Sequence, residues 1–592
     1  MISSTCWVPR GFASEFPEKY ELDDEEMQRI EEMANLNIAD AKEDLEEAET
    51  EEGEEGEELE DAPEEKTNSK SLKSEIDMDD DLKEYDLEHY DDEIDQSKGE
   101  SVGMFPGLSS SAAKYFKGDD DDEEDDDEEG NNGQDYLTLP TETDITEEKA
   151  ELQVYPTDNM ILATRTEDDI SYLDVYVYDD GAGAPQGAEE EEGDRLDPDV
   201  AKGLVREGNL YVHHDLMLPA FPLCVEWMSF KPNGVNDDSN IGNFAAIGTF
   251  DPTIEIWNLD CIDKAFPDVI LGENEMLNNK SSGKKKNNKK KKSAHVLTHH
   301  TDAVLSLSHN KVFRNVLAST SADATVKLWD LTNCAAVRSM KSIHNAKHVS
   351  SSQWYEGFNN SSDNGSMLLT GGYDSFACVS DVRISDENQM SKRWKVQNNE
   401  EIEVVKWGNN NNEGLFFAGT DNGNVYCFDA RIESKPIWTL HAHDAGISTL
   451  EINKFVKGML VTGAMGEKTV KLWKINEEDS KKGPSMVLSR DFGVGNVLTS
   501  NFAPDIEVAG NLVVGGSNTG LKMWDTFSNK YVRSSFKDSL RELQKSAREE
   551  AIRLGKSSRI ARKYINDNYH DTVLEAERGG AEEEEEDEED EE

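Results

Sequence analysis

The chain has little cysteine, no long apolar run and none of the short signatures of common active sites. Its 592 residues include six cysteines with no CxxC pair among them, namely Cys6, Cys224, Cys261, Cys334, Cys378 and Cys427. This spacing argues against a zinc site and a disulfide framework, and it indicates a reducing intracellular compartment. No stretch approaches the roughly 18 apolar residues of a membrane helix, and the start lacks the basic and apolar regions of a signal peptide. Without a P-loop, a dinucleotide fingerprint or a metal-ligand spacing, we also expect no cofactor and no small-molecule substrate.

Positive charge is scarce as well, since the formal net charge is −66. The excess lies in a few segments: residues 1–150 hold 54 acidic against 12 basic side chains, and residues 571–592 hold 14 against one. Segments of that composition cannot bury enough apolar surface to offset the entropy of ordering. They would repel nucleic acid and attract basic proteins such as a ribosomal protein or a histone. The composition predicts a mostly disordered leader with short docking segments over 1–135, an acidic insertion over 181–207 and a disordered tail over 569–592.

The rest of the chain contains a recurring unit. The stretch "NVLASTSADATVKLWDL" has two short runs rich in apolar and β-branched residues around a turn, and similar stretches recur six more times. The tryptophan position of each copy is marked by Tyr178, Trp257, Trp329, Ser380, Phe428, Trp473 and Trp524. The last four intervals are 51, 48, 45 and 51 residues, whereas the first two are longer and indicate insertions. This period predicts a repeat architecture built of short strands.

The unit resembles the WD40 repeat, in which each copy supplies one four-stranded blade of a β-propeller. The best matches are "TVKLWD", "TVKLWK" and "LKMWD". The resemblance implies an all-β fold, a seven-bladed WD40 β-propeller over 136–536 with a Lys-rich insertion over 271–294. Two segments qualify as the strand that closes the ring, "YLTLP" at 136–140 and "YVRSSF" at 531–536.

A histidine, a hydroxyl residue and an acidic residue recur within the copies and allow two interpretations. Together they suggest nucleophilic catalysis, which needs one activated hydroxyl in one pocket. In the WD40 family the same residues and the tryptophan form a hydrogen-bond network inside a blade, and three partial copies favour this structural role. The network residues are His300, Ser319, Asp323 and Trp329 in the third copy, His344, Thr370 and Asp374 in the fourth, and His443, Thr462 and Trp473 in the sixth, where Glu467 replaces the Asp. We therefore expect no enzyme activity.

A block of lysines, "KKKNNKKKK" at 284–292, lies in the long insertion between the second and third copies. A block of like charge cannot fold alone, so it should be a solvated loop. Three roles remain open for it: nuclear or nucleolar targeting, contact with RNA phosphates, and a charged loop without a partner. The residues concerned are Lys284, Lys285, Lys286, Lys289, Lys290, Lys291 and Lys292.

The segment after the last copy has the pattern of a basic amphipathic helix, which we place over 537–568. Apolar residues recur at helical spacing from Leu540 to Ile565 and form one stripe. Three positions are open for the stripe: on the propeller itself, on an RNA–protein assembly with the basic face on phosphate, or on a membrane, which the acidic tail disfavours. The candidate RNA-contacting residues are Arg541, Lys545, Arg548, Arg553, Lys556, Arg559, Arg562 and Lys563.

The order of these parts resembles the periodic tryptophan protein one family of eukaryotic WD40 proteins. The resemblance takes in "CWVPRGFA" near the N-terminus, the acidic leader, the Lys-rich insertion, the repeats, the basic helix and the acidic tail. It implies a non-enzymatic scaffold of the nucleus and nucleolus that assembles the precursor of the large ribosomal subunit and supports processing of its rRNA. The partners would be rRNA, ribosomal proteins and other assembly factors. The alternative is a histone chaperone or chromatin-binding protein whose acidic segments hold histones.

Overall fold

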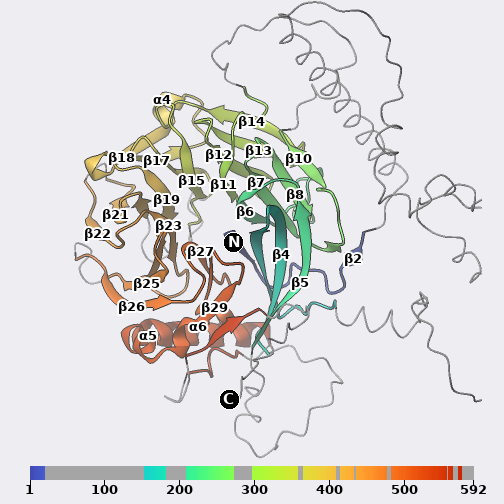
Figure 1. Cartoon of the computed structure of the whole chain (residues 1–592), viewed down its shortest axis with the longest axis vertical. Helices are drawn as coiled ribbons and strands as arrows, with labels where there is room; N and C mark the ends of the chain where they lie inside the picture. The colour runs from blue at the N-terminus through green and yellow to red at the C-terminus, as the bar shows by residue number, and fades with distance from the viewer. Residues whose placement is uncertain are drawn as a thin grey trace, which may run out of the picture. The chain divides into compact units, whose positions relative to one another are not determined.

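The computed structural model describes the repeat region together with both ends that complete it. The described residues are 1–20, 152–181, 208–272, 296–357, 365–408, 414–432, 435–476, 482–555, 558–564 and 571–576. Most of the acidic leader, most of both insertions with the lysine block, and the tail from residue 577 lie outside these ranges, so their predicted disorder stays a prediction. Within the described residues, seven four-stranded sheets stand around a common centre (Figure 1). The predicted all-β, seven-bladed propeller is confirmed.

Each blade is an antiparallel sheet of four strands, which are named below in order from the innermost to the outermost. Blade 1 consists of β1 (Ile2–Val8), β3 (Asn159–Glu167), β4 (Ile170–Asp179) and β5 (Asn209–Leu218), and blade 2 of β6 (Pro222–Met228), β7 (Phe244–Thr249), β8 (Ile254–Asn258) and β10 (Val269–Leu271). Blade 3 consists of β11 (Val304–His309), β12 (Val316–Ser321), β13 (Val326–Asp330) and β14 (Ala335–Met340), and blade 4 of β15 (Val349–Trp354), β16 (Met367–Gly372), β17 (Phe376–Asp381) and β18 (Ser391–Lys395).

The other three blades follow the same order. Blade 5 consists of β19 (Ile402–Trp407), β20 (Leu415–Thr420), β21 (Asn424–Asp429) and β22 (Trp438–His441), and blade 6 of β23 (Ile447–Ile452), β24 (Met459–Ala464), β25 (Thr469–Lys474) and β26 (Ser485–Asp491). Blade 7 consists of β27 (Val497–Phe502), β28 (Asn511–Gly516), β29 (Lys522–Asp525) and β30 (Val573–Glu575). A short parallel ladder pairs β2 (Glu18–Lys19) with β9 (Cys261–Ile262).

The apolar core is divided into layers between neighbouring blades. The middle strands of a blade are covered on both faces, so four consecutive residues of β13, "VKLW", are all buried. Trp257 and Trp329 are less than 2% exposed, and each fills the space between its own blade and a neighbour. Each of the seven blade-to-blade contacts among the described residues has its own apolar cluster. A sheet with two apolar faces is stable only with a neighbour on each side, which is the physical reason for a closed ring.

The ring closes between blades 7 and 1. The innermost strands contact one another in the order β1, β6, β11, β15, β19, β23, β27 and back to β1. The indole nitrogen of Trp7 donates to the carbonyl of Asn501 at 3.1 Å, and the Asn501 amide donates to the carbonyl of Thr5 at 2.7 Å. Figure 1 accordingly shows the N-terminus at the middle of the ring. The first residues of the chain therefore form part of the propeller's inner wall.

Neither predicted closing strand holds this position. The segment at 531–536 is not a strand, because helix α5 (Lys530–Ser535) occupies it, and the segment at 136–140 lies outside the described residues. The first blade takes its innermost strand from Ile2–Val8, and the last blade takes its outermost strand from Val573–Glu575. The predicted limits of 136 and 536 are therefore wrong at both ends. Neither terminal strand belongs to a copy of the repeat, so the period contained no signal for them.

The predicted amphipathic helix is present but shorter. Helix α6 (Lys537–Leu554) ends at Gly555, whose φ of 68° is left-handed and whose N–H bonds back to the carbonyls of Ala551 and Ile552. Glycine at this position stops a helix because it takes the left-handed conformation without steric cost. The continuation to residue 568 was therefore a wrong prediction. The other described helical segments are α4 (Glu387–Met390) and the 3-10 turns η5 (Gln397–Asn399), η6 (Ile506–Val508) and η7 (Thr526–Ser528).

The apolar stripe of α6 packs on the propeller itself. Leu540, Leu543, Ala547 and Ala551 are its buried residues. The first three belong to the apolar cluster of blades 6 and 7, and Figure 1 shows α5 and α6 along that side of the ring. The first of the three positions considered for the stripe is the observed one, and the stripe shares its apolar cluster with Phe527, Val532 and Phe536.

Candidate functional site

The predicted polar set of blade 3 is brought together inside the blade. Ser319 comes from β12, Trp329 from β13, Asp323 from the turn between them and His300 from the loop before β11. The indole N–H of Trp329 donates to Ser319 Oγ at 2.8 Å, and that oxygen lies 2.7 Å from His300 Nε2. His300 Nδ1 lies 2.9 Å from the Asp323 carboxylate. Taken alone, this is the order of groups in a serine hydrolase triad.

Burial decides against catalysis at this set. Ser319 and His300 are both 0% exposed, so no substrate carbonyl can reach the hydroxyl. Burial lowers the pKa of His300 although Asp323 opposes it, and the imidazole stays neutral. Burial would raise the pKa of Asp323, but hydrogen bonds from His300, Thr325 and the Thr301 N–H outweigh it and lower that pKa. The set therefore satisfies buried polar groups and ties the loop before β11 to the sheet.

The same geometry recurs in blades 4 and 6. His344 lies 2.9 Å from Asp374 and 2.8 Å from Thr370. His443 lies 2.7 Å from Glu467 and 2.9 Å from Thr462 Oγ1, which also accepts the indole of Trp473 at 2.8 Å. Burial would raise the pKa of Glu467, but hydrogen bonds from His443 and the Asp444 N–H lower it to about 2. Three copies of one arrangement indicate a bracing device rather than one reactive centre.

Blades 2, 5 and 7 use other residues for this purpose, and the sequence pattern did not indicate them. In blade 5, the buried carboxylate of Glu400 accepts from Thr420 at 2.8 Å and from Tyr426 at 3.0 Å. Its distance from the hydroxyl in sequence, 20 positions, is close to the 19 positions between His300 and Ser319. That spacing was a usable signal, but a pattern that requires a histidine does not include it.

Blades 2 and 7 satisfy their tryptophans by different carboxylates. Trp257 donates to Glu255 at 3.1 Å within one strand, and burial raises the pKa of Glu255 to about 7. Trp524 donates to Asp571 at 2.9 Å, and Asp571 also pairs with Arg490 at 2.6 Å. Asp571 stands just before β30, far outside the repeat, so no spacing within a copy could have indicated it.

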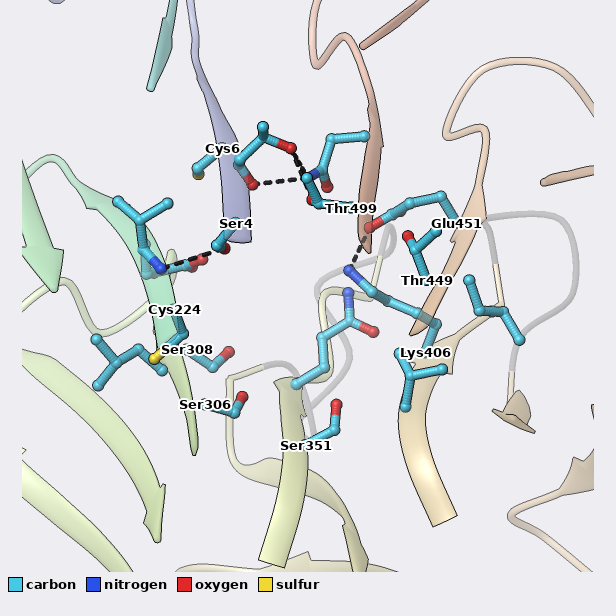
Figure 2. A pocket seen from close by; sticks show the side chains of 18 of the residues that line it. Ser4, Cys6, Cys224, Ser306, Ser308, Ser351, Lys406, Thr449, Glu451 and Thr499 are labelled. Atoms are coloured by element: carbon cyan, nitrogen blue, oxygen red, sulfur yellow. Dashed lines mark hydrogen bonds and ion pairs between the residues drawn. The ribbon is translucent and has the colours of Figure 1, made fainter. Parts of the chain in front are cut away.

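Every blade contributes residues to the lining of the central channel, which encloses about 510 Å³. Its wall is the ring of innermost strands, whose alternate residues face inward. Figure 2 shows side chains that line the channel, among them Ser4, Cys6 and Lys406. One level holds Ser4, Cys224, Ser306, Ser351, Val404, Thr449 and Thr499, and the next holds Cys6, Glu226, Ser308, Gln353, Lys406, Glu451 and Asn501.

The polar groups of the channel link one blade to the next. The hydroxyls of Thr449 and Ser500 lie 2.9 Å apart, and Lys406 forms an ion pair with Glu451 of the following blade, drawn in Figure 2. Burial raises the pKa of Cys6 and of Cys224 to about 12, so both thiols stay protonated at neutral pH. Among the described residues, no group of three or more His, Cys, Asp or Glu side chains is placed to hold a metal ion.

The candidate RNA-contacting residues fall into two groups. Arg541, Lys545, Arg548 and Arg553 are exposed on α6. Lys563 is directed inward, because its ammonium lies 2.9 Å from the Asp525 carboxylate.

The other candidates follow the end of α6. The backbone N–H of Arg559 donates to Glu507 at 2.9 Å, its guanidinium lies 4.0 Å from Asp180, and its side chain is 15% exposed. Arg562 is half-buried. Arg559 and Lys563 thus fasten the segment after α6 to blades 1 and 7, which corrects their assignment to an RNA-binding face. Lys556 and the block from Lys284 to Lys292 lie outside the described residues, and no helix within the described ranges has the length and apolarity to cross a membrane.

Comparison with known proteins gives the family. Residues 291–330 match the model of the WD domain, G-beta repeat. Periodic tryptophan protein 1 of Saccharomyces cerevisiae is 59% identical, with 99% of this chain and 98% of that protein covered. An uncharacterised WD repeat-containing protein of Schizosaccharomyces pombe is 36% identical over 92% of each chain, and the periodic tryptophan protein 1 homolog of Drosophila melanogaster is 28% identical over 85% of this chain and 89% of its own. The chain forms a closed ring of seven blades that buried polar sets brace, and nearly its whole length aligns with the yeast protein. It therefore belongs to the periodic tryptophan protein 1 family of WD-repeat proteins.

Proposed function

We propose that this protein is a non-enzymatic scaffold of ribosome biogenesis that binds the precursor of the large ribosomal subunit in the nucleolus and supports processing of its rRNA. The observation that carries the scaffold role is the burial of the polar sets that resemble a catalytic one, with Ser319, His300 and Thr462 all 0% exposed. A rigid ring whose polar chemistry is enclosed offers surfaces rather than a reaction. The assignment to ribosome assembly rests on what the family resemblance implies.

The exposed cations of α6 are the proposed contact with rRNA. Because the apolar stripe is packed on blades 6 and 7, the helix cannot swing away, and its outer face stays fixed. The side chains of Arg541, Lys545 and Arg553 are 66%, 78% and 74% exposed. Their carboxylate neighbours on the same helix lie 3.4 to 4.0 Å away, and exposed pairs of this kind contribute only about 0.2–1 kcal/mol, so phosphates can replace them.

Charge removal on α6 tests the RNA contact. We expect a variant with Arg541, Lys545, Arg548 and Arg553 changed to glutamine to bind precursor rRNA more weakly. The slope of log affinity against log salt should fall by roughly 0.7 for each phosphate that the variant no longer neutralises. The matched control changes the exposed lysines Lys341 and Lys395, which belong to blades 3 and 4, to glutamine. Equal slopes for the wild type and the α6 variant would remove the helix from the interface.

The lysine block is proposed to add a second contact with rRNA through charge alone. Replacing its seven lysines with glutamine should lower the salt slope by up to about 5 if all seven meet phosphate. An unchanged slope with loss of nucleolar enrichment would assign the block to targeting. Sedimentation of the wild-type chain with large-subunit precursors is the direct test of the whole proposal, and its absence from those fractions would refute it.

The alternative, histone binding by the acidic segments, has its own test. Every described strand lies outside residues 22–139, so deletion of that segment leaves all of them in place. Under the alternative, this deletion abolishes histone binding in a pull-down with purified histones. Under the proposed function, it leaves sedimentation with ribosomal precursors largely unchanged.

A further inference from the structure

A second surface, on blades 1 and 2, is open and is not explained by the proposed function. It is a groove lined by the hairpin between β3 and β4, by the connection from β5 to β6 and by Met1, and it encloses about 790 Å³. Its apolar lining consists of Met1, Ile170, Leu218, Pro219, Ala220 and Phe221. This surface is separate from α6, which packs on blades 6 and 7.

The groove and its border expose large apolar side chains to solvent. Ile170 in the groove is 45% exposed, and Phe250 at its border is 60% exposed. The ring of Phe250 lies 5.4 Å from the ring of Phe221, and the Phe250 N–H donates to the Phe221 carbonyl at 3.1 Å. Exposed apolar side chains that lie together, in contrast to scattered ones, mark interaction sites. We refer to Ile170 and Phe221, together with Phe250 at the border, as the floor of the groove.

Three carboxylates form the rim of the groove, two of them in its lining and the third next to Phe250 at its border. Asp168 and Asp169 form the two-residue turn between β3 and β4 and have φ values of 48° and 68°. A turn with positive φ at both central residues matches the twist of a hairpin and fixes the positions of both residues. Asp251 follows Phe250 and is also exposed. Within the described part of the chain, no ion pair joins these three carboxylates to a cation, while the guanidinium on the hairpin, Arg165, is bound to Asp174 and Glu167 at 2.8 and 2.6 Å.

We propose that this groove binds an extended segment of a basic protein, with one large apolar side chain on Ile170 and Phe250 and flanking lysines or arginines on the aspartates of the rim. Charge complementarity selects this occupant. RNA would be repelled by the three carboxylates, and the chain's own leader would be as well, because residues 1–150 hold 54 acidic against 12 basic side chains. A second copy would bring the same acidic rim to the contact. The inference goes beyond the proposed function, which places RNA on α6.

Fluorescence anisotropy with the full-length protein tests the proposal. The probe is a short labelled peptide with one leucine flanked by lysines on both sides. Two comparison peptides replace the leucine with serine or the lysines with glutamate. Two double variants change the groove: Ile170→Ser with Phe250→Ser for the floor, and Asp168→Asn with Asp169→Asn for the rim. Two single variants are the controls. Val337→Ser changes a side chain on β14 that is 66% exposed, and Asp263→Asn changes an exposed aspartate with a φ of 57°. Asparagine tolerates the left-handed conformation, so the rim variant should fold like the wild type.

We expect the lysine–leucine peptide to bind with higher affinity than either comparison peptide. The floor variant should weaken this binding by about tenfold, since the variant removes two large apolar side chains from the contact. The rim variant should weaken it by about two- to tenfold and remove most of its salt dependence. The two controls should leave the affinity unchanged.

Several results would overturn the proposal. Equal binding of the glutamate peptide, or equal affinity of the floor variant, would show that the groove does not select a basic apolar segment. Tighter peptide binding after deletion of residues 22–139 would identify the leader as the occupant, and a floor variant that shifts the protein from dimer to monomer would identify a second copy. Sedimentation with ribosomal precursors is measured separately on the same variants, so failure of the groove and failure of the proposed function remain distinguishable.

Discussion

Replacing Ser319 with alanine separates the bracing role from catalysis most directly. The substitution removes one oxygen that is bonded to the Trp329 indole at 2.8 Å and to the His300 imidazole at 2.7 Å. Both partners are almost fully buried, at 1% and 0% exposure, so no water can take the place of the hydroxyl. A buried polar group left without a partner costs about 1–3 kcal/mol. With two such groups, we expect a loss of about 2–6 kcal/mol in the free energy of unfolding.

The chain provides a matched control for this experiment. Threonine occupies the position equivalent to Ser319 in two other blades, as Thr370 and Thr462, and there it makes the same contacts to histidine. Ser319→Thr keeps the hydroxyl and adds one methyl group at a position where two other blades hold threonine, so the loss should be smaller than for alanine. Urea unfolding of the purified chain, followed by tryptophan fluorescence, measures both variants. Hydrogen exchange of β12 and β13 shows whether the loss is centred on blade 3.

Two results would refute the reasoning. If alanine were as stable as serine, the hydroxyl would not be needed as the acceptor of the buried indole. If alanine abolished a hydrolytic activity at unchanged stability, the set would be catalytic despite its burial.

Three further predictions concern other parts of the structure. Burial lowers the pKa of His309 from 6.5 to about 4, so on acidification the unfolded chain takes up the proton before the folded chain does. The free energy of unfolding should therefore be at its full value above about pH 6.5 and lower by about 2 kcal/mol at pH 5. Urea titrations at these two pH values should show a smaller difference for His309→Gln than for the wild type. Gly555→Ala should cost about 1 kcal/mol in thermal melts because the φ of 68° is unfavourable for alanine, although the described residues beyond its own helix and chain neighbours place no atom within 4 Å of the added methyl group. Deleting Ile2–Val8 removes the inner strand of blade 1 and should abolish soluble expression, whereas deleting residues 22–139 should not; a soluble, cooperatively unfolding product of the first deletion would contradict the closed ring.

Much of the bracing could be predicted from the amino-acid order because it is local. His300, Ser319, Asp323 and Trp329 lie within about thirty positions of one another, and strand pairing at fixed register brings them together. Glu400 was missed although its spacing to Thr420 is similar to that of His300 to Ser319. The carboxylate takes the place of the imidazole in the same geometry, but a search for histidine does not find it. In blade 5, spacing was therefore a better guide than residue identity.

The C-terminal segment shows where local pattern stops being informative. Leu540, Leu543 and Ala547 indicated an amphipathic helix, but amphipathicity does not say which surface covers the stripe. The helix packs on blades 6 and 7, and this places Lys563 beside Asp525 rather than toward a partner. Lys563, which the pattern assigned to a basic face, thus has a structural role in the folded chain. This difference between prediction and structure depends only on the path of the chain after Gly555.

The sequence by itself determined the seven-unit sheet architecture, the buried polar sets of blades 3, 4 and 6, and the acidic composition of the outer segments, because all of these arise from patterns within about fifty residues. Tertiary structure alone decided how the ring closes and which charges remain outside. Strands β1 and β30 join blades whose other strands lie far away in the sequence, and only the need to cover the open apolar face of the first and last blades brings them there.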